Sequence, residues 1–533
     1  PSVYFEPVGP IEARSPVERP QPGRPSARRR VVPLGELRAL LALDGGGDPA
    51  VAFDRDGTVY YAEINFHRTG CASMILVYRS VNGGLTWNRP LFGKPTPGDT
   101  RNEGDGVVVM NENDNNCRHF YDKEFLAVGP RPAGVVLVKG TDMAHLSPDR
   151  LYVTYSDFRL LPPVGVQPYV GPAVYVMSPI AISYSDDQGR HWSALREISG
   201  ASQTLCPGSP LAGRCATDQS SIPVVDPRTG RIYVYFFNSD TAEDPVTQQA
   251  APLTDQQLIP SQILMVSSSD GGARWSDPAL IADVKDDNLP RAGDAVEPSP
   301  GGEDVRCPDQ AVGRQVLGDT CFRWLPFGNP AVDPTSGRLY AVWSDNRNGT
   351  QETVGSGPAA ITRYATDVDV FISTSGDGTT WSEPKRVNTD PLGNGADQFF
   401  PWVAVGPDGA VHVSFLDRVQ DPAHHDVGAT LCVSRDQSAS FSCAPSSTGS
   451  WDPDLAFRKG LFIGDYTGMA VGPNGSFAAW PDARRGRKAE KGDNPPSEAS
   501  EIVGSFSSRV FPATAASSSR PPPRTRSHPS SRR

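Results

Sequence analysis

Acidic side chains recur where strand-like apolar runs begin, together with a lysine, an asparagine and a tyrosine. The set is Asp48, Asp122, Lys123, Glu124, Asp218, Asn329, Asp397, Asp465 and Tyr466. At the ends of other runs, an acid stands one or two residues before an arginine: Asp157 with Arg159, Asp345 with Arg347, Asp417 with Arg418, and Asp482 with Arg484. Carboxyl groups can transfer protons, and guanidinium groups bind carboxylates through two parallel hydrogen bonds. Brought together in a pocket, such groups suit a polyhydroxylated or acidic sugar.

The elements that carry these residues form a repeat of six units. Each unit has a strand-like run, a turn rich in Pro, Asp and Gly, and a second run, as in Asp48–Phe53 followed by Val59–Tyr61. In five units a further hairpin signal follows. Six units of four strands predict an all-β fold, a six-bladed β-propeller of antiparallel sheets. The 52 glycines and 52 prolines mark many turns, and no long stretch has a helical period.

The further hairpin signal is a short motif with fixed spacing. Its copies are Ser80, Asn82, Gly84 and Trp87; Ser185, Asp187, Gly189 and Trp192; Ser268, Asp270, Gly272 and Trp275; Thr374, Asp377, Gly378 and Trp381; and a worn copy with Ser434, Asp436, Ser440 and Phe441. An acid or amide two residues after a serine can close a tight turn. The glycine adopts a backbone conformation that other residues resist, and the tryptophan buries a large flat surface. The motif therefore predicts hairpin ends rather than catalytic residues.

This S-x-D-x-G-x-x-W spacing resembles the Asp-box, or bacterial neuraminidase repeat, of the sialidase superfamily. The resemblance covers the whole propeller and implies a tyrosine nucleophile assisted by a glutamate, a separate aspartate as acid/base, and three arginines for the substrate carboxylate. In that family the tyrosine begins the innermost strand of the last blade, a position that Tyr466 matches.

The resemblance therefore implies that Tyr466 is the nucleophile. Glu124 is the candidate partner because it also stands where a strand-like run begins. Asp48 and Asp465 complete the predicted catalytic set. The predicted substrate-binding residues are Asp122, Lys123, Asp218, Asp397, Arg159, Arg347 and Arg418. For each Asp–Arg pair, a structural role in capping strand ends is the competing interpretation.

One part of the family pattern is missing. The Arg-Ile-Pro signature that supplies a triad arginine falls on Gly47, Asp48 and Pro49, so the arginine is absent. Without it, recognition of a sugar carboxylate is weakened. Two functions from different classes remain open. The first is an exo-glycosidase acting on terminal sugars of glycans through an axial pocket, and the second is a non-catalytic propeller that binds a glycan or a protein.

The charge distribution separates the body of the chain from its end. The formal net charge is −11, while residues 484–533 hold 11 basic and 4 acidic residues, which leaves −18 on the remainder. An acidic body disfavours nucleic-acid binding, because phosphate contacts require cationic surface. We expect an N-terminal extension over residues 1–40, the propeller over 41–512, and a disordered Ser/Pro/Arg tail over 513–533.

The eight cysteines fall into couples that are close in sequence: Cys71 with Cys117, Cys206 with Cys215, Cys307 with Cys321, and Cys432 with Cys443. Proximity suggests these disulfides, although eight cysteines allow 105 pairings. Disulfides indicate an exported protein, whose leader is absent from this chain. No apolar run is long enough to span a membrane, and we expect a monomer whose partner is a glycan or glycoconjugate.

No cofactor is expected, and no cysteine spacing suggests a transition metal. A structural calcium ion remains open, because residues 111–115 and the acids Asp283, Asp286 and Asp287 are rich in oxygen ligands. Neither segment has EF-hand spacing.

Overall fold

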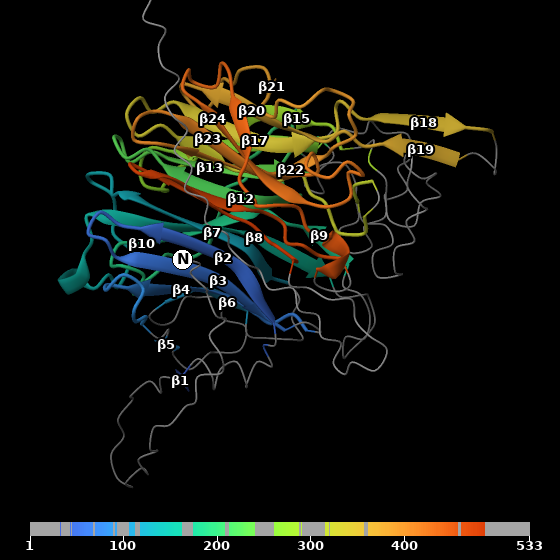
Figure 1. The fold of residues 1–533 in the computed structure, drawn as a ribbon. Helices are drawn as coiled ribbons and strands as arrows, with labels where there is room; N and C mark the ends of the chain where they lie inside the picture. The colour runs from blue at the N-terminus through green and yellow to red at the C-terminus, as the bar shows by residue number, and fades with distance from the viewer. Residues whose placement is uncertain are drawn as a thin grey trace, which may run out of the picture.

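The computed structural model describes residues 32–33, 43, 45–67, 70–88, 91–92, 106–111, 118–161, 174–207, 213–239, 261–286, 289, 315–318, 320–356, 361–456 and 460–484. These residues form antiparallel β-strands joined by turns, with short 3-10 helices such as Met143–His145 and Pro453–Leu455 (Figure 1). None of the helices in this part of the chain has the length and apolar character that crossing a bilayer requires.

Six sheet units follow one another along the chain, in the order that the repeat predicts. The first contains β2 (Gly45–Phe53), β3 (Val59–Phe66), β4 (Ser73–Ser80) and β6 (Val107–Asn111). The second contains β7 (Phe120–Pro130), β8 (Asp149–Leu161), β10 (Ile180–Ser185) and β11 (Arg196–Glu197), with β9 (Val174–Met177) paired to the end of β8. The third contains β12 (Asp218–Val225), β13 (Ile232–Asn238), β14 (Ser261–Ser268) and β15 (Ala279–Val284).

The fourth unit contains β16 (Pro330–Val332), β17 (Leu339–Asp345), β20 (Asp369–Ser375) and β21 (Lys385–Arg386). The fifth contains β22 (Gln398–Val405), β23 (Val411–Asp417), β24 (Gly428–Ser434) and β25 (Ser442–Pro445). The sixth is described by β26 (Gly468–Gly472) and β27 (Gly475–Ala479). Two small ribbons lie outside these units: β1 (Val32–Pro33) with β5 (Leu91–Phe92), and β18 (Thr350–Val354) with β19 (Ile361–Ala365).

The middle strands are apolar on both faces because each sheet is covered by a sheet on either side. In β13, Ile232, Val234 and Phe236 pack into one cluster with residues of the second sheet. The alternate residues Tyr233, Tyr235 and Phe237 pack into another cluster with residues of the fourth. Side chains of a strand alternate between its faces, so one run of buried apolar residues joins three sheets. Full burial of one such side chain contributes about 1.5–3 kcal/mol.

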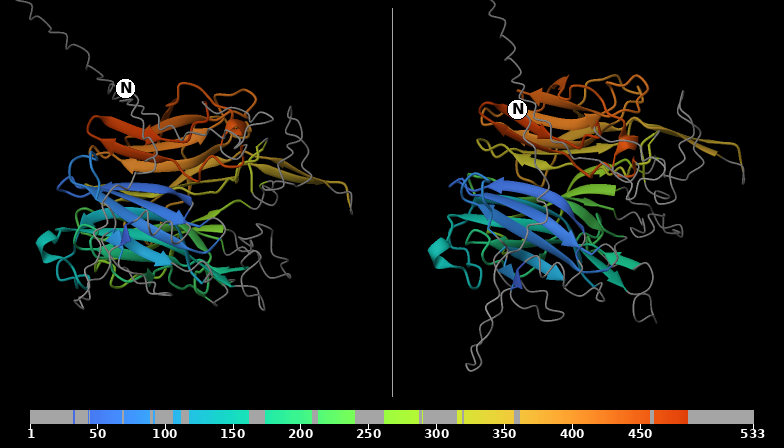
Figure 2. Two further views of the ribbon diagram at one scale, coloured as in Figure 1. Left: turned by 90° about the horizontal axis from the view of Figure 1, so that it is seen from below. Right: turned by 60° about the horizontal axis from the view of Figure 1, so that its bottom comes forward.

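The first strands of successive units pack against one another: β2 against β7, β7 against β12, β12 against β16, β16 against β22, and β22 against β26. Figure 1 places β2, β7, β12 and β22 toward the middle of the molecule, and Figure 2 shows the same stacked sheets from two further directions. The predicted all-β propeller of antiparallel sheets is confirmed. The predicted closing strands, Glu501–Phe506 and Val3–Phe5, lie outside the described residues.

The repeated motif forms a turn at the end of the third strand of a unit. In the second copy, Ser185 Oγ donates to Asp187 Oδ1 at 3.0 Å and accepts from the Gly189 amide at 2.9 Å. Gly189 has φ +80°, and its carbonyl accepts from Trp192 Nε1 at 3.1 Å. The first and third copies make the same bonds through Ser80 and Ser268. The predicted hairpin-end role therefore has a direct structural basis.

The fourth copy corrects one predicted residue. Ser375, not Thr374, takes the serine position, because its Oγ donates to Asp377 Oδ1 at 3.1 Å and accepts from the Gly378 amide at 2.8 Å. Asp377 thus keeps the usual spacing from the serine, and Gly378 comes one residue early. In the fifth copy Ser438, at φ +69°, stands where the other copies have glycine.

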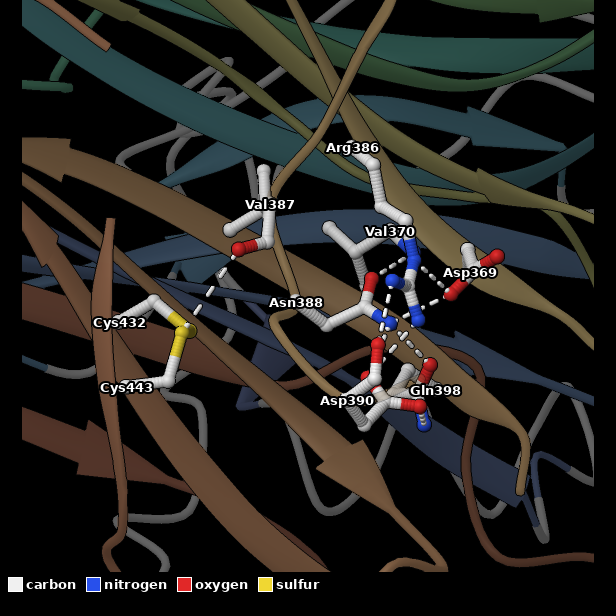
Figure 3. The surroundings of a disulfide bond; sticks show 9 residues. All are labelled: Asp369, Val370, Arg386, Val387, Asn388, Asp390, Gln398, Cys432 and Cys443. Atoms are coloured by element: carbon white, nitrogen blue, oxygen red, sulfur yellow. Dashed lines mark hydrogen bonds and ion pairs between the residues drawn. A yellow bond between two sulfur atoms is a disulfide. The ribbon is translucent and has the colours of Figure 1, made fainter. Parts of the chain in front are cut away.

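Two of the predicted disulfides lie within the described residues. Cys206 pairs with Cys215, and Cys432 pairs with Cys443 across the β24–β25 hairpin. Figure 3 shows the second bond beside the junction of the fourth and fifth sheets, where Asn388 donates to Asp390 Oδ1 at 2.7 Å. Cys71 and Cys321 are also disulfide-bonded. Their predicted partners, Cys117 and Cys307, lie outside the described residues.

Candidate functional site

Four first strands share a bulge at the end where the predicted site residues lie. The pairing of β2, β7, β12 and β22 shifts register between Gly47 and Ala50, Asp122 and Phe125, Gln219 and Ile222, and Phe399 and Trp402. Inside each shift stands a non-glycine residue with φ between +51° and +55°: Asp48, Lys123, Ser220 and Phe400. A bulge re-aims side chains, and non-glycine residues at positive φ gather at functional sites. The repeat therefore bends these strands where Asp48, Lys123 and Glu124 occur.

The bulges contribute to a group of charged residues that we call the central cluster: Asp48, Asp122, Lys123, Glu124, Arg323, Asp465 and Tyr466. They come from the first, second and sixth units and from the segment before the fourth. Six of the seven are predicted site residues, and Arg323 is the addition. The fold thus brings together residues that are far apart in sequence, such as Lys123 and Asp465, which are 342 positions apart.

Asp465 is the ion-pairing centre of this cluster. Lys123 Nζ donates to its Oδ2 at 2.5 Å, and both side chains are buried. Arg323 Nε donates to its Oδ1 at 3.1 Å and Nη2 to its Oδ2 at 2.5 Å. Burial alone would raise the pKa of Asp465, but Arg323 and Lys123 together hold that pKa well below its ordinary value. Asp465 is therefore a carboxylate at any ordinary pH.

Lys123 stays charged for the reciprocal reason. Burial would lower the pKa of its ammonium group, but the carboxylates of Asp465 and Asp48 outweigh that effect and raise the pKa. Its Nζ also lies 5.6 Å from the ring centroids of Phe327 and Tyr466. A cation over an aromatic face is stabilised by the ring electrons.

Glu124 is in the opposite electrostatic situation. Its side chain is 0% exposed, and neither carboxyl oxygen has a hydrogen-bond partner on another described residue. Burial, followed by the nearby charge of Asp48, raises its pKa well above the ordinary value. Burial and Asp48 therefore both favour the protonated form of Glu124.

Asp122 is a second acid with a raised pKa. Its Oδ1 accepts from the Lys123 amide at 2.8 Å. Burial and then the charge of Asp48 raise the pKa of Asp122 to about 7. The two acids on either side of Lys123 in sequence thus both have raised pKa values.

Tyr466 lies against the same group. Its ring meets the ring of Phe125 edge-on, with 5.1 Å between centroids. Its buried hydroxyl lies beside the Asp48 carboxylate without reaching standard hydrogen-bond geometry. Burial, Asp48 and Asp465 raise the pKa of this phenol well above its ordinary value. The phenol is neutral, so it can act as a nucleophile only if a base such as Asp48 takes its proton.

The remaining predicted site residues are held by partners outside the central cluster. Asn238 Nδ2 donates to Asp218 Oδ1 at 2.6 Å, and Arg418 Nη1 donates to Asp397 Oδ2 at 3.2 Å. Asn329 Nδ2 donates to the Val403 carbonyl at 3.0 Å and so ties the fourth sheet to the fifth.

The Asp–Arg motifs end the second strands at the sheet end where the first strands begin, since Tyr121 pairs with Asp157 and Gln398 with Asp417. Three of the four form local pairs, whereas Arg418 pairs with Asp397. Arg347 Nε donates to Asp345 Oδ1 at 2.8 Å, and the Arg347 guanidinium lies 4.2 Å from the ring centroid of Phe371. Arg159 Nη2 donates to Asp157 Oδ2 at 2.9 Å and also pairs with Glu197. Arg484 pairs with Asp482 in the same way. In these contacts the arginines cap strand ends, which is the competing interpretation of the motif.

Arg323 was not predicted from the sequence. It stands between Cys321 and Trp324, outside the strand runs and outside both repeats. The one available signal was that Arg323 stands a few residues before β16, the first strand of the fourth unit. Many other residues are equally close to a first strand.

The oxygen-rich segments proposed for calcium fall partly outside the described residues. Within the described chain, Asn111 Nδ2 donates to the Cys71 carbonyl at 3.0 Å, and Gln262 donates to Asp283 Oδ1 at 3.5 Å. Histidines and acids close enough to share an ion occur in this part of the chain at His425, Asp426 and Asp452, which are partly exposed. A cavity of about 360 Å³ lies elsewhere again, beside Cys215, Glu197 and Arg214, and the central cluster does not line it.

No protein-family model and no curated protein matches this chain. Among solved structures, the chain is similar to a protein of unknown function from Dyadobacter fermentans DSM 18053, with 13% identity, 82% of this chain and 90% of that chain covered, and a TM-score of 0.39. It is also similar to a GH93 α-L-arabinofuranosidase of Fusarium graminearum (13% identity, 82% and 88% covered, TM-score 0.37). A Hadza microbial sialidase has 13% identity, 76% and 60% covered, and a TM-score of 0.37. At these values no argument about activity rests on the likenesses.

Proposed function

We propose that this chain is a glycoside hydrolase that cleaves terminal sugars from glycans at the central cluster. The observation that carries the proposal is Glu124, a buried acid with a raised pKa and no hydrogen-bond partner among the described residues, in the same group as Asp48 and Tyr466. Burying a polar group without a hydrogen bond is unfavourable, so such a group in a folded protein calls for a functional explanation. A proton held ready for a departing sugar oxygen is such an explanation.

The proposed first step divides the work among three side chains. Tyr466 Oη attacks the anomeric carbon while Asp48 takes the phenol proton. The bond from that carbon to the glycosidic oxygen breaks, and the oxygen leaves with the proton of Glu124. A tyrosine nucleophile is an established alternative to the usual carboxylate in glycosidases.

The second step releases the sugar and restores the site. Water attacks the anomeric carbon and gives its proton to the Glu124 carboxylate. The bond to Tyr466 Oη breaks, and the phenolate recovers its proton from Asp48. Asp48 and Asp122 are partly exposed, so an incoming sugar reaches the cluster from their side.

A non-catalytic glycan-binding propeller is the second candidate. The observation that favours it is the lack of an arginine triad: among the described members of the central cluster, Arg323 is the sole arginine, and it already pairs with Asp465. The same carboxyl groups would then accept hydrogen bonds from sugar hydroxyls without cleaving a bond. In either case the disulfides support an exported protein.

A panel of fluorogenic aryl glycosides tests the enzymatic proposal. We expect the wild-type protein to release fluorophore from at least one glycoside, and Tyr466→Phe and Glu124→Gln each to lower that rate by about 10²–10⁴-fold, the range for a lost proton-transfer group. Tyr340→Phe is the matched control, because the Tyr340 hydroxyl is also buried without a partner but lies in the fourth sheet. Folded wild-type protein that cleaves no glycoside but binds a glycan would establish the second candidate instead.

A further inference from the structure

We propose that Asp465 sets the substrate class of the central cluster: it occupies the two cations of the site with a carboxylate of the protein itself, and so excludes acidic sugars in favour of neutral and amino sugars. This inference rests on the proposed function, because it names the sugars that the same site accepts.

The first support is that both cations of the cluster donate their hydrogen bonds to the same carboxylate. Lys123 Nζ and two nitrogens of Arg323 all donate to the Asp465 carboxylate. A guanidinium fork with an ammonium group is a receptor for a carboxylate, because it offers parallel donors and positive charge. Here Asp465 of the same chain already occupies this receptor.

The second support is the charge of what remains. Asp48, Asp122 and Glu124 interact electrostatically with one another, and the charges of Asp48 and Asp122 both raise the pKa of Lys123. Asp465 and Asp48 together match the two positive charges of Lys123 and Arg323, and Asp122 and Glu124 are two further acid groups of the described cluster. A sugar carboxylate would meet these acids without a free cation, whereas sugar hydroxyls and ammonium groups would find acceptors.

The third support is that the other candidate arginines are committed. Arg418 is buried with Asp397, and Arg347 and Arg159 bond the acids two residues before them. These described bonds direct the three arginines to acids outside the central cluster. Among the described residues, a substrate carboxylate would therefore gain the two cations of the cluster by displacing Asp465 from Lys123 and Arg323.

Matched sugar pairs test the inference by a binding measurement that needs no turnover. The pairs are methyl glucoside with methyl glucuronide, and methyl galactoside with methyl galacturonide, with methyl glucosaminide as the cationic member and N-acetylneuraminic acid as a further acid. Binding is followed by ligand-observed NMR and calorimetry. We expect the wild-type protein to bind a neutral or amino sugar at least about tenfold more tightly than its acidic counterpart.

Asp465→Asn keeps the shape of the side chain and removes its charge. We expect this variant to bind an acidic sugar at least about tenfold more tightly than the wild type does, because Lys123 and Arg323 are then available. Asp397→Asn is the matched control: it removes a buried acid that pairs with Arg418 at the corresponding strand end of the fifth unit, and should leave acid binding unchanged. Circular dichroism establishes that each variant is folded.

The outcomes separate the two proposals. A wild type that prefers the acidic member of a pair overturns the inference, even if Asp465→Asn fails to fold, and leaves the hydrolase proposal intact. A folded Asp465→Asn that gains no affinity for acids also overturns it. If the wild type neither binds nor cleaves any sugar, the proposed function fails. Formate binding to Asp465→Asn, but not to the wild type, would still show that Asp465 fills an anion site.

Discussion

Two adjacent residues in β7, Lys123 and Glu124, are both buried but differ in whether their surroundings favour the charged form. Asp465 and Asp48 raise the pKa of Lys123 and so keep it charged although it is buried, whereas burial and Asp48 both raise the pKa of Glu124 and so favour its neutral form. The bulge between Asp122 and Phe125 makes this possible, since it presents neighbouring residues to one centre. The chemistry of a residue here depends on which groups the bulge brings near it.

The raised pKa of Asp122 predicts a pH-dependent stability. Because the pKa is about 7 in the folded protein and 3.8 ordinarily, the folded state binds the Asp122 proton more tightly, and this group makes folding less favourable as the pH rises from about 4 to about 7. Asp122→Asn removes that effect and can still accept from the Lys123 amide. We therefore expect its stability relative to the wild type to rise over this window, measured by thermal unfolding at pH 4–8.

Asp333→Asn is the control for this measurement. Burial opposes the charge of Asp333, but hydrogen bonds from Ser336 and Thr335 lower its pKa to about 2. Its contribution is therefore nearly constant above about pH 5 and is lost progressively in stronger acid, where the sign of the effect is opposite to that of Asp122. A difference between Asp122→Asn and the wild type that does not change between pH 4 and 7 would contradict the prediction.

At the scale of the element, one turn motif serves in different environments. In the first and second copies, the tryptophan Nε1 donates to a glycine carbonyl at 3.0 and 3.1 Å, so the local bonds are alike. Trp192 is 5% exposed and packs between the first two sheets, while Trp87 is 40% exposed and meets Tyr61 edge-on. The motif determines the turn, and the neighbouring sheets determine how much surface its tryptophan buries.

This difference predicts unequal effects of the same substitution. Trp192→Ala should lower the free energy of unfolding by about 3–5 kcal/mol, as expected for a large buried aromatic side chain. Trp87→Ala loses the same hydrogen bond but little packing, and should lower it by about 1 kcal/mol. Urea denaturation of the two variants and the wild type measures both values. Equal losses would mean that the hydrogen bond, rather than packing, determines the contribution of the tryptophan.

At the scale of the whole molecule, distant units meet at the centre. Phe125 of the second unit lies 5.7 Å, between ring centroids, from Trp402 of the fifth and 5.1 Å from Tyr466 of the sixth. Thr467 Oγ1 donates to the Phe400 carbonyl at 2.9 Å, which ties the sixth unit to the fifth. Contacts between units that are far apart in sequence thus hold the acids of the central cluster in place.

Phe125→Ala should therefore affect both stability and the site. We expect a loss of about 3–5 kcal/mol in the free energy of unfolding, as for other buried aromatic residues, together with a lower rate of glycoside cleavage, because Tyr466 loses its edge contact. Phe236→Ala removes a fully buried ring from the core between the second and third sheets and is the control. It should destabilise the protein similarly but leave the activity of the folded fraction unchanged. Equal activity losses in the two variants would refute a specific role for Phe125.

The sequence by itself determined the features that depend on neighbouring residues. Strands, turns and unit boundaries follow from patterns within a few positions, since alternation and turn chemistry act locally. For the same reason the repeat predicted that Asp48, Lys123, Glu124 and Tyr466 would stand at equivalent strand ends. The left-handed backbone at Asp48 and Lys123 was not foreseen, because it belongs to bulges that depend on how the strands pair.

The tertiary structure alone decided which acids share a site and what charge each carries. Asp465 meets Arg323 across 142 positions and Lys123 across 342, and no local pattern encodes either contact. Asp218 and Asp397 have the same predicted positions as Asp465 but are bonded to Asn238 and Arg418. Because a pKa depends on burial and on every nearby charge, proton carriers such as Glu124 became distinguishable from ion-paired acids only once the sheets were packed.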